Sequence, residues 1–477
     1  MLWRKPLIAA LLICGTLTTA TAGEERTFSS SEGKEIRASF LSFQNNNVTL
    51  RRADGKSFDV PLDRLSKADQ DYIASLSSAA EDEAAAINDA AGLEISSGKS
   101  FHETDAGELA AALGLKPEST SKHGKSWRLY ASFVKDYTLF GAMPYSVALY
   151  SREDGTLRNI SIVYANKGDF GSTAGFAEDH FQSIGTKAPG TLAEAMDLDE
   201  KTLTTSLNSV FGDGTSQRYG ESGTRRDITR WDWNGHSFLL SSEEGEYVSL
   251  AIVSTETADN EGKSERMDDS TLKSRLAENV VIEENGDVHI SEIPMVDQGP
   301  KGYCVPATFE RAMRTMGIDA DMYLLAMVGQ SSAGGGTIVE LLLDNVKSAV
   351  YRKGRRTKDD SIKGIKIRDV KRYIDEGIPV MWSMCSMDEY NEIANNNTKL
   401  RSPGATALSP EIAAATEKIL DQPAPDDHYH ICMIIGYNET TGELAVSDSW
   451  GKRYELRWVP VEVASWASNG SLFMILP

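Results

Sequence analysis

Three side chains have the types and the chain order that nucleophilic catalysis by a thiol requires: Cys304, His430 and Asp448. A thiol becomes a strong nucleophile when a histidine accepts its proton and a carboxylate orients that histidine. Cys304 opens an apolar segment that runs to Met316 and predicts a helix. At a helix N-terminus, unpaired backbone N–H groups and the helix dipole favour an anion and lower a thiol pKa. These residues therefore predict a reactive thiolate.

A glutamine precedes the cysteine at a short distance. Gln298 lies six residues before Cys304, and the turn-forming residues Gly299 to Gly302 separate them. This spacing lets the amide of Gln298 return to the thiol as an oxyanion donor. An isolated cysteine is more often a small, inert core residue, so the prediction depends on the histidine and the carboxylate downstream.

Two strands must position these downstream residues. The apolar run that begins at His430 ends at Gly436–Tyr437, a turn follows at Thr441–Gly442, and a second strand reaches Asp448. Neighbouring antiparallel strands place such residues side by side on one face. The base and its orienting carboxylate are therefore expected to meet.

The motifs around these residues resemble those of papain-like cysteine peptidases. Gln-x5-Cys matches Gln298 and Cys304, and His-x5-Gly-Tyr begins at His430. Asp448-Ser-Trp-Gly stands where papain-type enzymes carry Asn-Ser-Trp-Gly. The Cys-x-Pro-Ala start of the helix is similar to that of bacterial double-glycine leader peptidases and their relatives, which also tend to use aspartate. The resemblance covers only about residues 290–477.

This resemblance implies a cysteine peptidase that hydrolyses peptide bonds in a peptide or protein substrate. The glutamine would donate to the oxyanion, and the aspartate would fix the histidine tautomer. The resemblance also implies that Gly334, Gly335 and Gly336 pair with the extended substrate, for which a plain flexible loop is an equal alternative. Trp450, which we also place at the substrate cleft, would shield the histidine–aspartate pair from water.

Several alternatives compete with this interpretation. His428, His430 and Cys432 would share one face of a strand and could bind a transition metal, but nothing else nearby has ligand spacing. We therefore expect neither a metal nor a cofactor, and the Gly-Tyr spacing selects His430 over His428 as the base. The same triad could serve a papain-fold amidase or acyltransferase acting on cell-wall material. A catalytically silent binding protein is the third alternative, against which the intact triad and glutamine argue.

The net charge and the N-terminal segment indicate which partners and which compartment to expect. The formal net charge of −21 argues against nucleic acid and anionic membrane surfaces as partners. Arg4 and Lys5 precede an apolar run, and Ala20-Thr21-Ala22 gives a cleavage site, so residues 1–22 predict a signal peptide. No other segment predicts an integral membrane span. We expect an exported protein, periplasmic or extracellular.

Three cysteines remain after removal of this segment: Cys304, Cys385 and Cys432. An odd, small number in an exported protein indicates a free reactive thiol rather than a disulfide framework. Cys385 and Cys432 could still pair with each other.

The chain predicts an α+β multidomain protein. Residues 23–76 resemble the small SH3-like barrels of the Sla-homology type, which implies an adaptor for a protein or cell-envelope ligand, or a structural role. The polar intervals 77–99 and 256–285 predict linkers. Residues 100–255 predict an α+β domain with an antiparallel sheet and no catalytic constellation. Residues 286–477 predict a papain-like domain whose N-terminal helix packs on an antiparallel sheet.

Local patterns predict elements within these domains. The stretch Pro379–Cys385 predicts a central strand, and the polar insertion 386–427 predicts a lid over the cleft. A helix is predicted at Ala174–Ser183, and we expect residues from about 285 onward to fold alone. The strands predicted in the middle domain are Trp127–Val134, Tyr145–Tyr150, Leu157–Tyr164, Ile228–Trp233, His236–Leu240 and Tyr247–Val253.

Overall fold

The computed structural model divides the chain into two compact units, one ending at Ala84 and the other beginning at Ala85. Among the helices of the residues it describes, none is long and apolar enough to cross a membrane. The predicted signal peptide, residues 1–22, lies outside the residues that the structure describes. The structure describes residues 25–44, 46–54, 56–131, 134, 136–170, 189–221, 224–300, 302–331, 336–402 and 404–477.

The first unit is built on a four-stranded antiparallel sheet. Val48 and Leu50 alternate with more exposed residues on β3 and point into a small core with Phe28. This sheet agrees with the small β-domain predicted for residues 23–76. The elements are β1 (Glu25–Ser29), β2 (Glu35–Gln44), β3 (Asn47–Arg51), β4 (Ser57–Pro61) and the 3-10 helix η1 (Leu62–Arg64), with the strands in sequence order.

Helix α1 (Lys67–Ala91) begins in the first unit and continues into the second. The interval expected to be a linker from residue 77 is therefore helical through Ala91. Ile87 and Ala91 are buried in the core of the second unit, and these two apolar side chains attach the otherwise polar helix to it. Ser66 caps the helix by accepting the N–H of Asp69 at 3.2 Å.

The middle part of the chain forms an eight-stranded antiparallel sheet in the order β5-β6-β7-β8-β12-β11-β10-β9. All six predicted strands are present, and β5 and β9 at its edges were not predicted. The predicted helix Ala174–Ser183 lies outside the described residues. The elements are η2 (Phe101–Glu103), α2 (Ala106–Ala112), β5 (Lys116–Ser121), β6 (Gly124–Tyr130), β7 (Ser146–Ser151), β8 (Leu157–Asn166), α4 (Leu192–Phe211), β9 (Thr215–Tyr219), β10 (Arg226–Trp233), β11 (His236–Glu243) and β12 (Tyr247–Ser254).

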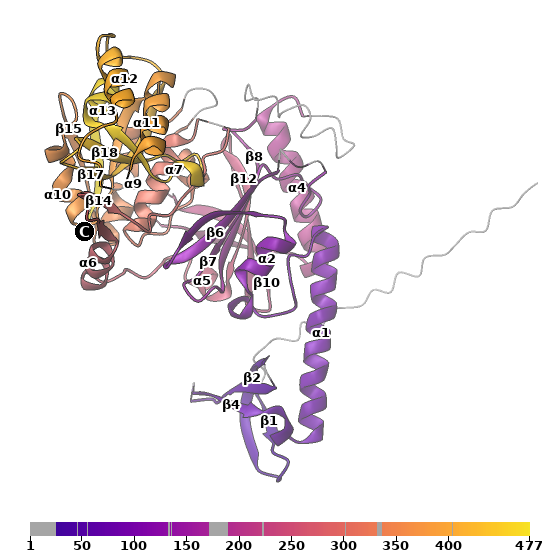
Figure 1. Ribbon diagram of the computed structural model, residues 1–477. Helices are drawn as coiled ribbons and strands as arrows, with labels where there is room; N and C mark the ends of the chain where they lie inside the picture. Colours follow the sequence, from indigo (N-terminus) through magenta and orange to yellow (C-terminus); the bar gives the residue numbers. More distant parts are fainter. Residues whose placement is uncertain are drawn as a thin grey trace, which may run out of the picture. The chain divides into compact units, whose positions relative to one another are not determined.

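The two faces of this sheet differ in chemistry. One face is apolar and is covered by α2 and α4 (Figure 1), which bury residues such as Leu149 and Ile162. The opposite face carries smaller and more polar residues, including Ser161 and Ser249, and it also carries Val163. Val163 packs in a cluster with Ala307, which belongs to the C-terminal part of the chain. The polar face therefore lies against the C-terminal part.

The interval 256–285 differs from the expected linker because it is largely ordered into short elements. Leu272 and Leu276 lie one helical turn apart and are buried in the core of the C-terminal part. These two leucines suffice to bury one side of an otherwise polar helix, which the composition concealed. The elements from here to β14 are α5 (Thr255–Asp259), α6 (Asp269–Glu278), β13 (Val280–Ile282) and β14 (Asp287–Ile290).

The C-terminal part is a second antiparallel sheet with helices packed on it, so the predicted α+β multidomain class is confirmed. The sheet order is β13-β14-β17-β16-β20-β15, and β18 pairs with β17 and β19. The predicted strand at 379–385 is indeed central. The elements are α7 (Cys304–Thr315), α8 (Met322–Val328), α9 (Val339–Arg352), β15 (Arg356–Ser361), α10 (Ile367–Asp375), β16 (Val380–Cys385), α11 (Asp388–Leu400), α12 (Pro410–Leu420), β17 (Tyr429–Asn438), β18 (Glu443–Ser447), η5 (Lys452–Tyr454), β19 (Arg457–Pro460), α13 (Val461–Ala467) and β20 (Ser468–Leu476).

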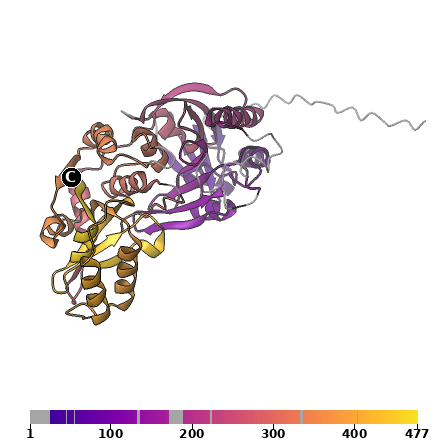
Figure 2. The same ribbon diagram turned by 90° about the horizontal axis from the view of Figure 1, so that it is seen from above.

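The insertion 386–427, expected to be a lid, contributes two helices to the fold instead. Tyr390 and Ile393 on α11, and Ile412 on α12, are buried in the core. Figure 2 shows these orange helices beside the yellow C-terminal strands, and α11 packs directly on β19. The polar sequence concealed the few apolar residues that attach the helices.

Candidate active site

The thiol of Cys304 lies at the first residue of α7. Backbone hydrogen bonds from Val305 and Ile431 reach the sulfur, as expected at a helix N-terminus that faces a strand. Burial on its own would raise the pKa of Cys304. A hydrogen bond with His430, the positive charge of that ring and the two backbone contacts outweigh burial, so the pKa of the thiol lies below its usual value.

His430 lies near the start of β17, and Asp448 follows directly after the end of β18. Met433 pairs with Ser447 in the register of these strands. One step further, Asp448 falls opposite Cys432, two residues from the histidine and on the same face. His430 Nε2 hydrogen-bonds to Asp448 Oδ1 at 2.9 Å, which leaves Nδ1 for the thiol. The structure thus brings Cys304, His430 and Asp448 together.

The charges of this trio favour an ion pair between the sulfur and the imidazole. Burial would lower the pKa of His430, but its hydrogen bonds with Asp448 and Cys304 and their charges raise it to about 9. Burial would raise the pKa of Asp448, but the charge of Arg457 and the contact with His430 lower it. These shifts in pKa favour a protonated imidazole between a thiolate and a carboxylate.

Arg457 on β19 is a residue of this site that sequence reasoning missed. Its guanidinium donates to Asp448 Oδ2 at 2.5 Å and is almost completely buried. The same guanidinium donates to Asn391 Oδ1 at 3.0 Å and to Asn395 Oδ1 at 3.2 Å, both on α11. Helix α11, which belongs to the interval predicted to be a lid, thus supports the carboxylate of Asp448 through Arg457. Neither the distance along the chain nor any motif connects these residues.

Trp450 lies on the ring of His430 rather than apart from it. The two rings are stacked, with centroids 4.7 Å apart and planes 28° from parallel. Tyr454 meets the edge of the indole with centroids 5.4 Å apart. The indole therefore covers one face of the histidine ring, and the predicted shielding of the pair from water stays a prediction.

The segment that carries Gln298 is held from two sides. On one side, the backbone N–H of Gln298 donates to the carbonyl of Ser449 at 2.9 Å, directly beside the aspartate. On the other side, residues of the middle domain hydrogen-bond to the preceding residue, Asp297. Tyr130 Oη donates to its carbonyl at 2.5 Å, and its N–H donates to Glu118 Oε1 at 2.9 Å. Residues expected to have no part in the site therefore fix its glutamine segment.

Gly299 shows how closely the middle domain approaches this segment. Its φ is +69°, and a Cβ at this position would stand 2.6 Å from the ring of Tyr130. Both the backbone conformation and the close ring require glycine. The turn between the glutamine and the cysteine is therefore shaped by a side chain more than 160 residues earlier in the chain.

A second arginine, Arg311, connects helix α7 to the rest of the site. It is buried about two helical turns beyond Cys304 and donates to the carbonyl of Pro294 at 2.9 Å. It also donates to the carbonyl and hydroxyl of Ser447, the last residue before the aspartate. Burial lowers the pKa of Arg311 to about 10. One side chain thus joins α7, β18 and the segment that leads to the glutamine.

The glycine-rich segment is described only at its last residue. Gly334 and Gly335 lie outside the described residues, and their predicted role stays a prediction. The Cα of Gly336 lies 3.9 Å from the position that a Cβ on Gly302 would occupy, two residues before the thiol. Gly336 therefore borders the turn that precedes Cys304.

The remaining cysteines and the second histidine lie elsewhere. None of the three cysteines Cys304, Cys385 and Cys432 forms a disulfide. In the sheet register, Cys432 lies opposite Trp382 and Cys385 lies opposite Tyr429. His428 precedes β17, has a φ of +52° and is exposed, so it does not share the face of His430. Within the described ranges, no group of three or more metal-ligating side chains is arranged to hold an ion.

Two family models match the chain. Residues 290–472 match the Peptidase C39-like family, and residues 25–80 match SLA1 homology domain 1. These matches confirm both resemblances predicted from the motifs, and they give the C-terminal part a cysteine-peptidase-like fold. No curated protein matches the chain.

Proposed function

We propose that this protein is an exported cysteine peptidase that hydrolyses peptide bonds with Cys304 as the nucleophile. The observation that supports the proposal most is the hydrogen-bonded series from Cys304 through His430 to Asp448. A buried histidine that contacts a thiol with one ring nitrogen and a carboxylate with the other is the arrangement that generates a thiolate at neutral pH.

In the proposed mechanism, the Cys304 thiolate attacks the carbonyl carbon of the scissile amide and forms a tetrahedral intermediate. Gln298 and the backbone N–H of Cys304 donate to the oxyanion, and each such donor contributes about 3 kcal/mol. His430 then donates its proton to the leaving amine as the C–N bond breaks, which leaves a thioester. A water molecule, deprotonated by His430, attacks the thioester and releases the acid.

Peptide turnover and thiol labelling test this proposal together. The full-length protein is incubated with a peptide library, with cell-wall peptide fragments and, separately, with a haloacetamide probe that is located by mass spectrometry. We expect cleavage of a subset of the peptides and labelling at Cys304. Cleavage of the cell-wall fragments alone would move the substrate class to amidase chemistry, and no turnover of any substrate would leave a binding protein.

Cys304→Ala should abolish both turnover and labelling, whereas Cys385→Ala should preserve both. Cys385 is a matched control because burial and the nearby charge of Asp427 raise the pKa of its thiol. Undiminished turnover by Cys304→Ala would overturn the assignment of the nucleophile.

We also propose that residues 1–22 direct export and that the first unit attaches the enzyme to a protein or cell-envelope ligand. The charged start, the apolar run and the small residues at Ala20–Ala22 support export. Cell fractionation of the full chain and of a chain without residues 2–22 tests this. Equal distribution of both forms would contradict it.

A further inference from the structure

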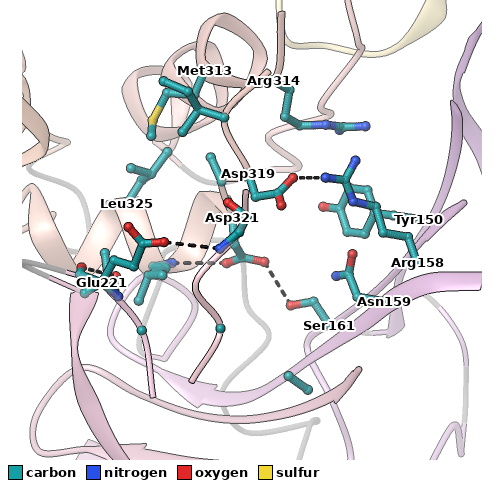
Figure 3. Close-up of a pocket in the computed structure, with 18 of the residues that line it drawn as sticks. Tyr150, Arg158, Asn159, Ser161, Glu221, Met313, Arg314, Asp319, Asp321 and Leu325 are labelled. Carbon is teal, nitrogen blue, oxygen red and sulfur yellow. Dashed lines mark hydrogen bonds and ion pairs between the residues drawn. The ribbon is translucent and has the colours of Figure 1, made fainter. Parts of the chain in front are cut away.

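A cavity of about 590 Å³ lies between the polar face of the middle sheet and the helices of the C-terminal part. Its volume is in the range of pockets that bind small organic molecules. Figure 3 shows Tyr150 and Ser161 of the sheet on one side, and Met313 and Arg314 of α7 on the other. Arg314 is ten residues from Cys304 along this helix, or about 15 Å, so the cavity is separate from the thiol.

The charge of the cavity is opposite to that of the protein. Seven basic and four acidic side chains line it, although the whole chain carries a net charge of −21. The cavity is partly open to solvent, and a cleft lined by an excess of one sign of charge attracts ions of the opposite sign. The cavity is therefore electrostatically suited to an anionic ligand.

The acidic side chains are already engaged by partners within the cavity. Arg158 pairs with Asp319, and Ser161 donates to Asp321 at 2.9 Å, as Figure 3 shows. The Lys353 ammonium donates to Glu221 at 2.6 Å. Asp319 and Glu221 are therefore already paired with other basic side chains, whereas Asp321 accepts only from neutral donors.

Two arginines of the cavity are less fully compensated. Arg275 on α6 is half-buried and has no hydrogen bond or ion pair within the described part of the chain. Arg314 contacts Glu310 at 3.4 Å and lies over the ring of Tyr150, 4.8 Å from its centroid, and burial raises the pKa of Glu310 to about 7. Burial, followed by the charges of Arg158 and Arg314, lowers the pKa of Arg275, although the nearby Glu153 opposes this. Both guanidiniums line the same cavity.

A neighbouring histidine has a polar atom that faces the same space. His123 lines the cavity, and its Nε2 is buried without a hydrogen-bond partner among the described residues. Its other ring nitrogen lies 3.4 Å from Glu153. A bound anion would give this nitrogen a partner as well, because a neutral imidazole protonated at Nε2 donates from that nitrogen.

We propose that this cavity binds a small organic anion, whose carboxylate or phosphate groups are held by Arg275 and Arg314. Guanidinium groups suit this role because their planar donor arrangement matches both kinds of oxyanion. The site is independent of the peptidase chemistry, since none of its residues contacts the thiol or its histidine.

Calorimetric titration of the full-length protein with citrate and, separately, with inorganic phosphate tests the proposal at constant ionic strength. We expect saturable binding with one anion per chain and a raised thermal unfolding midpoint. Binding of citrate alone assigns a carboxylate ligand, and binding of phosphate alone assigns a phosphate ester. No heat and no thermal shift with either anion overturns the proposal, whatever the variants do.

Arg275→Gln should weaken anion binding at least about tenfold, and Arg275→Lys should weaken it less because the charge remains. Arg368→Gln is the matched control, since Arg368 is an exposed arginine on α10 outside the cavity. Equal weakening by Arg275→Gln and Arg368→Gln would mean non-specific attraction and would overturn the site. Peptide turnover measured on the same variants is expected to stay unchanged, so the result does not depend on the proposed function.

Discussion

At the scale of single residues, Arg457 explains why an aspartate stands where papain-type sites carry asparagine. One oxygen of Asp448 accepts from His430 and the other accepts from the buried guanidinium of Arg457. An asparagine could satisfy the histidine through its carbonyl oxygen, but its amide N–H groups would then face the guanidinium. The aspartate is therefore required by its second partner as well as by the histidine.

Asp448→Asn should destabilise the protein by about 3 kcal/mol, because it leaves the charge of Arg457 buried without an anion. The double variant Asp448→Asn with Arg457→Met should recover at least half of that loss. Urea unfolding of the single and double variants measures both effects, with Asp427→Asn as an exposed control. A double variant no more stable than Asp448→Asn would contradict this account of the pair.

The rate of peptide hydrolysis should rise and then fall with pH. The acid limb reports protonation of the thiolate, and the alkaline limb, near pH 9, reports loss of the His430 proton that the leaving amine needs. The folded pKa of His430 lies above its ordinary 6.5, so its stabilising contribution is complete below that pH and is lost as pH rises through about 9. Removing Asp448 and Arg457 together should move the alkaline limb to lower pH. Profiles of kcat/KM for both proteins measure this, and an unmoved limb would contradict it.

At the scale of elements, the end of strand β6 acts on the glutamine segment from the middle domain. Tyr130→Phe keeps the ring over Gly299 but removes the hydrogen bond to the carbonyl of Asp297. We expect kcat to fall about fivefold, which corresponds to the roughly 1 kcal/mol of one hydrogen bond, with little change in KM. Tyr130 is here a positioning residue.

Tyr137→Phe is the matched control for this prediction. Its buried hydroxyl also donates to a backbone carbonyl, that of Leu113, but both residues lie within the middle domain. Comparing kcat and KM of the two variants separates a positioning effect from a general loss of stability. Equal loss of kcat in both would show that the tyrosine contributes only to stability.

The elements that the sequence predicted and those it concealed differ in their place in the sheets. Central strands such as Val380–Cys385 are apolar and were readily predicted. The strands Lys116–Ser121, Thr215–Tyr219 and Arg356–Ser361 are polar and were missed. Each of these three lies at the edge of its sheet, where only one neighbour supplies hydrogen bonds and charged side chains discourage further pairing. Apolar alternation cannot reveal such strands.

The candidate site divides in a similar way. Short motifs along the chain identify four residues of the candidate site: Gln298, Cys304, His430 and Asp448. Arg457, Tyr130 and Glu118 join the site only through contacts made in space, and no local pattern records those contacts. Residues that hold a site from another domain become visible only with the fold.

At the scale of the whole molecule, the middle domain and the C-terminal part are expected to unfold together. A chain that begins at Asn279 would lose Leu272 and Leu276 from the core and Tyr130 from the glutamine segment. It should be unfolded or inactive, contrary to the expectation that residues from about 285 fold alone. A chain that begins at Ala85 keeps the second unit and should turn over substrate. Thermal melting and turnover of both chains decide this, and an active chain from Asn279 would contradict it.

The contact between Asp448 and Arg457 also constrains how this sequence can drift over generations. A change at either position alone leaves one buried charge without its counterpart, so the two positions are expected to be inherited as a pair. Relatives with asparagine at the position of Asp448 should therefore carry an uncharged residue at the position of Arg457. Where the arginine persists, so should the aspartate, and its persistence would mark the relatives in which helix α11 supports the residue that contacts His430.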